Sequence, residues 1–392
     1  MKKVCCLLMM LALLLSGCNL SEPEVAKYNG TLEGYEYFHT EERDLKWEED
    51  ILFLAETFLE NHPRLSDKQF PVRKLIMDTE SSRYKYEYED TNSFFDETAR
   101  NEFIQLINQL IPEISRLTNA EIAYELQRIV ATLGDAHSVF TVGFRSFFPL
   151  QFYPVYDEMC VSLYAVKVPV GYEHLLLGKL TAINDVPIDE ILERLSAYVS
   201  FENEYWMMEQ MVNSSPGSLL TQMAALQQAG IAKIDATDAV FTFETENGVE
   251  NVVINTFPAS EYGNVQLISH PMIDKFSYNA QDSLYWYELI NNDKTLYIRF
   301  SKMVDNPSYP MSSFLGEIKK ITREAKDPLQ LVFDFRGNTG GYPLIDDING
   351  LIAAINQYST NGVYVLINNG TFSAGNGVAY RLANGINNAQ FV

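Results

Sequence analysis

Apolar side chains recur three and four positions apart over residues 46–139, which is the spacing of a buried helix face. The first such face consists of Trp47, Ile51, Leu54, Phe58 and Leu59. Pro63 disfavours helical backbone in the residue before it, so we expect this helix to end there. Two further faces follow over 103–110 and 122–133, and Asn119 is placed to cap the second of them. The pattern predicts a helical N-terminal domain.

Over residues 140–290 the pattern changes to short runs that are typical of strands. These runs cover residues 150–155, 159–168, 239–244 and 251–257. Helical patterns at 188–198 and near 218–229 interrupt them. We therefore expect a β-rich middle domain.

Strands and helices alternate in residues 291–392. The strand-like runs lie at 295–300, 329–335 and 363–367, and the helical ones at 314–325, at 344–355 and from 373 to 382. This alternation predicts a mostly parallel sheet, and in such sheets sites gather at the carboxyl ends of the strands. Two glycine-rich segments lie there, one after Phe335 and one after Ile367. The whole chain is thus expected to be a multidomain α+β protein with a C-terminal α/β core.

The extreme N-terminus has the pattern of a targeting signal. Two lysines precede an apolar run, residues 4–15, that is short for a bilayer span. The Leu-Ser-Gly-Cys sequence ending at Cys18 resembles a bacterial lipobox, in which the cysteine carries lipid. A plain signal peptide or an anchor helix is the alternative. We expect a lipoprotein signal peptide over 1–18, a polar tether over 19–45, and an extracytoplasmic protein anchored to the bacterial cell membrane.

Composition narrows the class of protein. At 392 residues with 47% apolar residues, the chain is long enough for two or three folded domains. Its formal charge of −23 disfavours nucleic acid and anionic membrane surfaces as partners. Once the predicted signal is removed and Cys18 is lipidated, only Cys160 remains. Cys160 lies in a strand-like run, so we expect a buried structural thiol and no disulfide framework.

The segment Asp-Phe-Arg-Gly-Asn-Thr-Gly-Gly, residues 334–341, ends a predicted strand. Glycines let the backbone turn sharply and bring N–H groups close to a ligand, where they bind a phosphate or stabilise an oxyanion. The glycine spacing fits neither the dinucleotide fingerprint nor the P-loop. The alternative is a tight turn in which Arg336 pairs with Asp334.

Ser373 opens a predicted helix directly after a strand. Its hydroxyl would lie at the positive end of the helix dipole, and the N–H of Ala374 would face an oxyanion. A serine at this position more commonly caps the helix. An α/β-hydrolase elbow requires glycine where this chain has Thr371. The residues alone leave a nucleophile and a cap equally open.

Of the five histidines, His137 alone lies at a glycine-marked junction between a helix and a strand, in Leu-Gly-Asp-Ala-His-Ser. A serine nucleophile needs a base, and histidine is the usual one near neutral pH. A metal site is the alternative. Asp135 and His137 supply two candidate ligands for it, and the sequence offers no clear third.

Three segments occur in order: "LGDAHS" (133–138), "LVFDFRGNTGG" (331–341) and "TFSAGN" (371–376). Together they resemble the C-terminal processing (tail-specific) serine peptidase family, which includes the tricorn core protease. The segment "EDILFLAETFLENHP" (49–63) is similar to the N-terminal region of lipoprotein-type members. The resemblance implies a ClpP/crotonase-like core over 291–392 and a substrate-positioning middle domain. Residues 175–195 are faintly similar to the end of a PDZ domain.

The resemblance also implies residue roles. Ser373 matches the family's nucleophile, and His137 matches the base of tricorn-like members. Oxyanion N–H groups would come from Ala374 and from Gly340 or Gly341. Supporting roles fall to Asp135, Asp334, Arg336 and Asn338. No metal or organic cofactor is implied.

Two departures from the family pattern concern the partners of the serine. No lysine follows Ser373, which favours a Ser–His mechanism over a Ser–Lys dyad. No Asp or Glu follows Asp347, and Asn376 stands where many members have glutamate. The orienting acid that triad logic requires is therefore not visible. We expect either that the chain continues beyond Val392, where it reads like the middle of a strand, or that the protein is an inactive relative.

These patterns predict a lipid-anchored serine endopeptidase that acts on peptides or proteins. A catalytically inactive surface lipoprotein that binds peptides or cell-envelope partners is the first alternative. A lipid-anchored esterase that uses the same residues is the second. In each case the membrane partner is reached through the lipid on Cys18.

Overall fold

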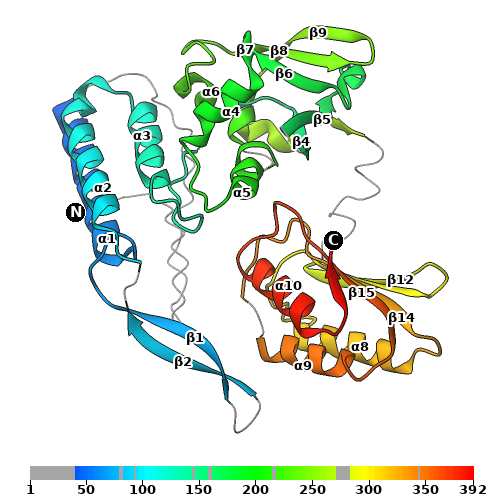
Figure 1. The fold of residues 1–392 in the computed structure, drawn as a ribbon. Coiled ribbons are helices and arrows are strands. Elements are labelled where there is room, and N and C mark those ends of the chain that lie inside the picture. Colours follow the sequence, from blue (N-terminus) through cyan, green and yellow to red (C-terminus); the bar gives the residue numbers. More distant parts are fainter. Residues whose placement is uncertain are drawn as a thin grey trace. The chain divides into compact units, whose positions relative to one another are not determined.

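The structure is a computed structural model that describes residues 40–78, 83–91, 94–143, 146–157, 161–213, 218–270, 283–342 and 345–392. The predicted signal, Cys18, most of the predicted tether and Cys160 lie outside these residues. The chain forms two compact units that divide between Ile268 and Ser269 (Figure 1). The helical and β-rich segments, expected as separate domains, thus belong to one unit, and the α/β segment forms the other.

The first unit begins with helices that pack on a shared apolar core. They are α1 (Glu41–Asn61), α2 (Glu97–Leu110), the 3-10 turn η1 (Ile111–Arg116) and α3 (Asn119–Ala131). Fully buried side chains such as Ile51, Phe103 and Ile122 fill the core between them. The predicted helical faces are confirmed, because these residues recur at helical spacing and bury their apolar stripes together.

Two helix starts differ from the prediction. Helix α1 begins at Glu41, inside the predicted tether, because the Thr40 hydroxyl accepts a hydrogen bond from the N–H of Arg43. Helix α3 is capped by Thr118 and not by Asn119, in a capping box completed by Glu121. The predicted cap was therefore wrong by one residue.

A two-stranded antiparallel ribbon interrupts the helical segment. It consists of β1 (Phe70–Asp78) and β2 (Arg83–Thr91), paired along their full length (Figure 1). Sequence analysis missed this ribbon inside the predicted helical domain. The alternation of tyrosine with charged residues over 84–89 is the period-two signal that could have revealed it.

The β-rich part of the first unit is a sheet in the order β11-β5-β6-β8-β9, with β4 paired to β5 and β7 to β6. Its strands are β4 (Gln151–Tyr156), β5 (Val161–Pro169), β6 (Lys179–Ile183), β7 (Val186–Pro187), β8 (Asp238–Thr245), β9 (Gly248–Asn255) and β11 (Leu267–Ser269). A short pair joins β3 (Ser146–Phe147) to β10 (Phe257–Pro258). The helical elements are η2 (Glu173–Leu175), α4 (Ile188–Ser196), α5 (Glu204–Met208), the π-helical η3 (Glu209–Asn213), η4 (Leu219–Thr221), α6 (Met223–Gln228) and η5 (Ala259–Asn264). The four predicted strands correspond to β4, β5, β8 and β9.

The second unit is a five-stranded sheet in the order β12-β13-β14-β15-β16. Its strands are β12 (Tyr285–Ile290), β13 (Thr295–Phe300), β14 (Leu329–Asp334), β15 (Thr360–Leu366) and β16 (Ala389–Phe391), and its helices are α8 (Met311–Glu324), α9 (Ile345–Ile355) and α10 (Ala374–Gly385). Only β12 runs antiparallel to its neighbour. The prediction of a mostly parallel α/β sheet is confirmed. Strands β13 and β14 read as continuous apolar runs because most of their side chains are buried.

The parallel strands carry the glycine-rich segments to one edge of this sheet. The turns after β14 and β15 both follow carboxyl ends of adjacent strands. In the part of the chain that the structure describes, no helix combines the length and apolar character needed to cross a membrane.

Candidate functional site

Hydrogen bonds join the turn after β14 to the turn after β15 in the second unit. The Thr371 hydroxyl donates to the carbonyl of Phe335 at 2.9 Å, and the N–H of Phe372 donates to the carbonyl of Asn338 at 2.8 Å. The N–H of Gly337 donates to the side-chain oxygen of Asn368 at 2.7 Å. Both turns are therefore held as one rigid structure.

Ser373 lies at the end of this structure in an unusual backbone conformation. Its φ is 52° and its ψ is −123°, and it directly precedes α10. Its side chain makes no capping hydrogen bond to the helix, so the cap interpretation is contradicted. A positive φ in a residue other than glycine is strained by about 1–3 kcal/mol and is concentrated at functional sites.

Gly340 approaches Ser373 so closely that no larger residue fits. A Cβ at this position would lie 2.8 Å from the Cβ of Ser373 and 3.0 Å from the backbone nitrogen of Ala374. The φ of Gly340 is 98°, which also favours glycine. The fold thus brings three predicted site residues together: Ser373, Ala374 and Gly340.

Asn338 forms a hydrogen bond with one member of the glycine pair. Its side chain is fully buried, donates to the carbonyl of Phe300 at 2.9 Å and accepts from the N–H of Gly340 at 2.9 Å. The Gly340 N–H is therefore occupied. No described residue accepts a hydrogen bond from the N–H of Gly341 or of Ala374. Because the N–H of Met303 donates to the Gly340 carbonyl, the Gly341 N–H of the same peptide faces away from Met303.

Asp334 and Arg336 form an ion pair where the turn after β14 begins. The Asp334 carboxylate is fully buried and accepts from Arg336 Nη2 at 2.7 Å, from Arg299 Nη1 at 3.0 Å and from the Tyr297 hydroxyl. Burial raises the pKa of Asp334, but hydrogen bonding by Arg336 and the charge of Arg299 outweigh it, so this pKa lies below its usual range. Burial and the bond to Asp334 raise the pKa of Tyr297 to about 12. The predicted pairing of Arg336 with Asp334 is confirmed.

Sequence analysis missed Arg299, although the signal was present. An arginine inside the otherwise apolar run of β13 predicts a buried ion pair. Its guanidinium also donates to the carbonyl of Arg336 at 2.6 Å, which fixes the backbone where the turn begins.

A second group of predicted site residues lies in the first unit, in the turn after α3. Asp135 Oδ1 accepts from the N–H of His137 at 3.0 Å, and Asp135 Oδ2 accepts from the Ser138 hydroxyl at 2.6 Å. The His137 ring lies beside the same carboxylate, with its Nδ1 3.9 Å from Oδ1. The imidazole is 44% exposed, so it is accessible to a substrate or an ion.

His62 reinforces this turn, although sequence analysis singled out only His137 among the histidines. It is buried at the end of α1, where its Nε2 lies 3.3 Å from Asp135 Oδ2. Its Nδ1 accepts from the N–H of Arg64 at 3.2 Å, so the proton of the neutral ring belongs on Nε2 and points at the carboxylate. Burial raises the pKa of Asp135, but the hydrogen bonds from His62, Ser138 and the His137 N–H lower it by more. The pKa of Asp135 therefore lies well below its usual range.

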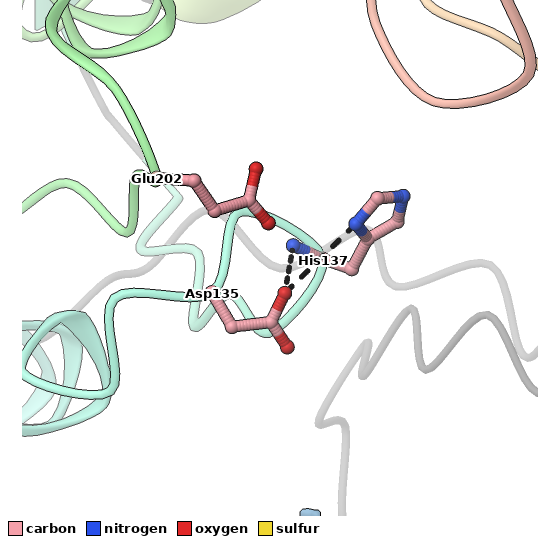
Figure 2. Close-up of side chains that lie close together, drawn as sticks. All are labelled: Asp135, His137 and Glu202. Atoms are coloured by element: carbon pink, nitrogen blue, oxygen red, sulfur yellow. Dashed lines mark hydrogen bonds and ion pairs between the residues drawn. The ribbon is translucent and has the colours of Figure 1, made fainter. Parts of the chain in front are cut away.

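Sequence analysis also missed Glu202. It lies in the loop before α5, and its Oε1 accepts from the N–H of Ala136 at 3.3 Å. Figure 2 shows its carboxylate beside Asp135 and His137. One ligand atom from each of these three residues lies within 4.8 Å of the others. Glu202 thus supplies the third candidate metal ligand that the sequence did not reveal.

The predicted site residues therefore fall into two groups. Ser373, Ala374, Gly340, Gly341 and the supporting Asn338 come together in the second unit. His137 and Asp135 come together in the first.

No protein-family model matches the sequence, and no curated protein matches it. Among solved structures, mature CPAF matches with a TM-score of 0.51 at 10% identity, over 89% of this chain and 83% of that chain. An alanine mutant of CPAF matches with a TM-score of 0.52 at the same identity and coverage. Mature CPAF complexed with lactacystin matches with a TM-score of 0.48 at 12% identity, over 79% of this chain and 59% of that chain. The chain therefore shares its fold with mature CPAF, a chlamydial serine protease similar to tail-specific proteases.

Proposed function

We propose that the chain is a serine endopeptidase of the tail-specific type. The observation that carries the proposal is the turn at Ser373. A serine stands on a strained backbone between a strand and a helix, Gly340 lies against it, and no described residue accepts from the N–H groups of Ala374 and Gly341. Such N–H groups stabilise the oxyanion of a tetrahedral intermediate, and each is typically worth about 10²–10³ in kcat.

The proposed mechanism assigns one step to each group. Ser373 Oγ attacks the scissile carbonyl while His137 accepts its proton, and His137 then protonates the leaving amine. The N–H groups of Ala374 and Gly341 hold the oxyanion. Gly341 is preferred over Gly340 because the Gly340 N–H is already bonded to Asn338. Asp135, fixed by the Ser138 hydroxyl and His62, orients the imidazole.

Two further observations support a peptidase. The fold likeness to mature CPAF covers 89% of this chain. The four parallel strands with helices α9 and α10 beside them are consistent with a ClpP/crotonase-like core. We interpret the β-rich part of the first unit as the substrate-positioning segment, with a PDZ-like fold as its expected form.

A fluorophosphonate probe tests the nucleophile directly. We expect the full chain to be labelled at Ser373, and Ser373→Ala to abolish labelling. Ser312→Ala is the matched control because Ser312 is an exposed serine in the first turn of α8, another helix of the same unit. His137→Ala should reduce labelling by at least about 10³-fold. Labelling that survives Ser373→Ala, or no labelling of the wild type, would refute the proposal.

Turnover separates the peptidase from its rivals. An endopeptidase cleaves internally quenched peptides with higher kcat/KM than small esters, whereas an esterase shows the reverse order. The inactive alternative is a surface lipoprotein that binds peptides without cleaving them. Peptide binding by wild type without turnover, unchanged in Ser373→Ala, would favour that alternative.

We also propose that Cys18 carries lipid and anchors the protein on the outer side of the cell membrane. The support is the lipobox-like sequence that ends at this cysteine. Metabolic labelling with a radioactive fatty acid should mark the wild type and not Cys18→Ser. In detergent phase partitioning the wild type should follow the detergent and the variant the water. Equal labelling of both proteins would contradict the anchor.

A further inference from the structure

The cluster of Asp135, His137 and Glu202 has the donor set of a transition-metal site. It combines one imidazole nitrogen with two carboxylate oxygens (Figure 2). Magnesium and calcium prefer oxygen ligands alone, whereas zinc readily takes nitrogen and oxygen together. Three protein ligands around zinc leave one position for water or another ligand.

The spacing of the ligand atoms suits a single ion. Tetrahedral zinc with bonds of about 2.0–2.1 Å separates its ligand atoms by roughly 3.3 Å. His137 Nδ1 lies 3.9 Å from Asp135 Oδ1, and the three ligand atoms lie within 4.8 Å of one another. Small side-chain rotations would bring the ligand atoms to the separation that zinc requires. His137 and Glu202 are exposed, so they rotate without repacking a core.

One ligand is already oriented by its surroundings. Asp135 Oδ2 is held by the Ser138 hydroxyl at 2.6 Å and lies 3.3 Å from the buried His62 Nε2, so Oδ1 is left on the side of His137 and Glu202. Metal-binding carboxylates are commonly fixed by such outer hydrogen bonds, which raise metal affinity. His62 is almost fully buried, and its hydrogen bond to the half-buried Asp135 is an observation independent of the exposed His137 and Glu202.

We propose that Asp135, His137 and Glu202 bind one Zn²⁺ ion, and that this ion inhibits the enzyme. The binding half of the proposal stands without the proposed function, and the inhibition half rests on it. Zinc on His137 Nδ1 leaves the single proton of the neutral ring on Nε2. The ring then has no lone pair with which to accept a proton from Ser373. Bound zinc therefore removes the general base while the nucleophile stays intact.

Isothermal titration of the full chain with ZnCl₂ tests the binding half. We expect one site with a Kd on the order of micromolar or tighter. Glu202→Gln keeps an acceptor for the Ala136 N–H and removes the charge, so it should weaken binding at least about tenfold without unfolding the loop. Glu250→Gln is the matched control, because His174 and the half-buried Glu250 place an imidazole and a carboxylate 3.5 Å apart in the same unit, with no third ligand beside them among the described residues. MgCl₂ should give no binding at the site.

Two results would overturn the site: wild-type affinity in Glu202→Gln, or an equal loss of affinity in Glu250→Gln. The inhibition half is tested by fluorophosphonate labelling and peptide turnover with zinc added and then removed by a chelator. Zinc should suppress wild-type turnover and leave Glu202→Gln nearly unaffected at the same concentration. Binding without inhibition would refute the inhibitory role alone. Absence of turnover in zinc-free wild type would refute the proposed function and leave the binding result standing.

Discussion

Replacing Gly375 by alanine probes the contact on which the proposed active site is built. Gly375 is buried in the first turn of α10, two residues after Ser373. A Cβ there would lie 2.7 Å from the carbonyl oxygen of Asn338 and 2.8 Å from its side-chain oxygen. The first oxygen accepts from the N–H of Phe372, which joins the two turns, and the second accepts from the N–H of Gly340 within the turn after β14. The added methyl group therefore strikes both hydrogen bonds.

The magnitude follows from opposing terms. Alanine in place of glycine gains about 1 kcal/mol of helix propensity. Overpacking costs about 1–3 kcal/mol, and each weakened hydrogen bond about 1 kcal/mol. Gly375→Ala should therefore lower the free energy of unfolding of the second unit by about 2–4 kcal/mol. Gly377→Ala is the matched control in the same helix, because nothing lies within 4 Å of its added Cβ. It should gain stability by up to about 1 kcal/mol.

Native-state hydrogen exchange with mass spectrometry reads the stability of α10 in the full chain. The segment should exchange faster than wild type in Gly375→Ala and slower in Gly377→Ala. Fluorophosphonate labelling should fall only in Gly375→Ala, since only that variant displaces the turn beside Ser373. If both variants gain stability alike, the close contact between α10 and Asn338 does not exist in solution and the reasoning fails.

Three further predictions concern the same turns. Asp334→Asn should destabilise the second unit by about 3–5 kcal/mol in urea unfolding, because it leaves buried arginine charge uncompensated. Because the folded-state pKa of Asp334 is lowered, its ionisation stabilises the wild type above a pH of about 4. This contribution is lost as the pH falls through the folded-state pKa. Asp334→Asn should lack that acid-dependent loss of stability. Thr371→Val should cost about 1–3 kcal/mol, measured by the same unfolding curves, since the buried carbonyl it bonds loses its donor; an unchanged curve would contradict the bridge between the turns. Gly340→Ala should leave no detectable fluorophosphonate labelling, because its methyl group would occupy the space of the Ser373 side chain; wild-type labelling would contradict that close approach.

The sequence was a good guide to the second unit because its signals are local. Buried parallel strands read as continuous apolar runs, and the glycines that end them mark sharp turns. Adjacent parallel strands place their carboxyl ends at one edge, so the meeting of Gly340 with Ser373 follows from the order of the elements. The backbone strain of Ser373 could not be foreseen, since it depends on how the two turns bond to each other.

The first unit was harder to predict because its site is assembled from distant segments. His62 meets Asp135 across 73 residues, and Glu202 meets Ala136 across 66. Neither residue stands in a local pattern that differs from ordinary surface or helix-end positions. Their convergence comes from the packing of α1 against the helices around it and from the course of the loop before α5. No periodicity encodes such contacts.

The backbone of Ser373 has a consequence for the evolution and engineering of this fold. Glycine adopts a φ of 52° and a ψ of −123° without steric penalty, whereas serine there is strained by about 1–3 kcal/mol. Glycine also makes the unfolded chain more flexible, which offsets about 0.5–1 kcal/mol of that relief. Ser373→Gly is thus expected to raise thermal stability modestly. A search for thermostable variants would then select against the very hydroxyl that the proposed chemistry needs, so this position must be held fixed in any such screen.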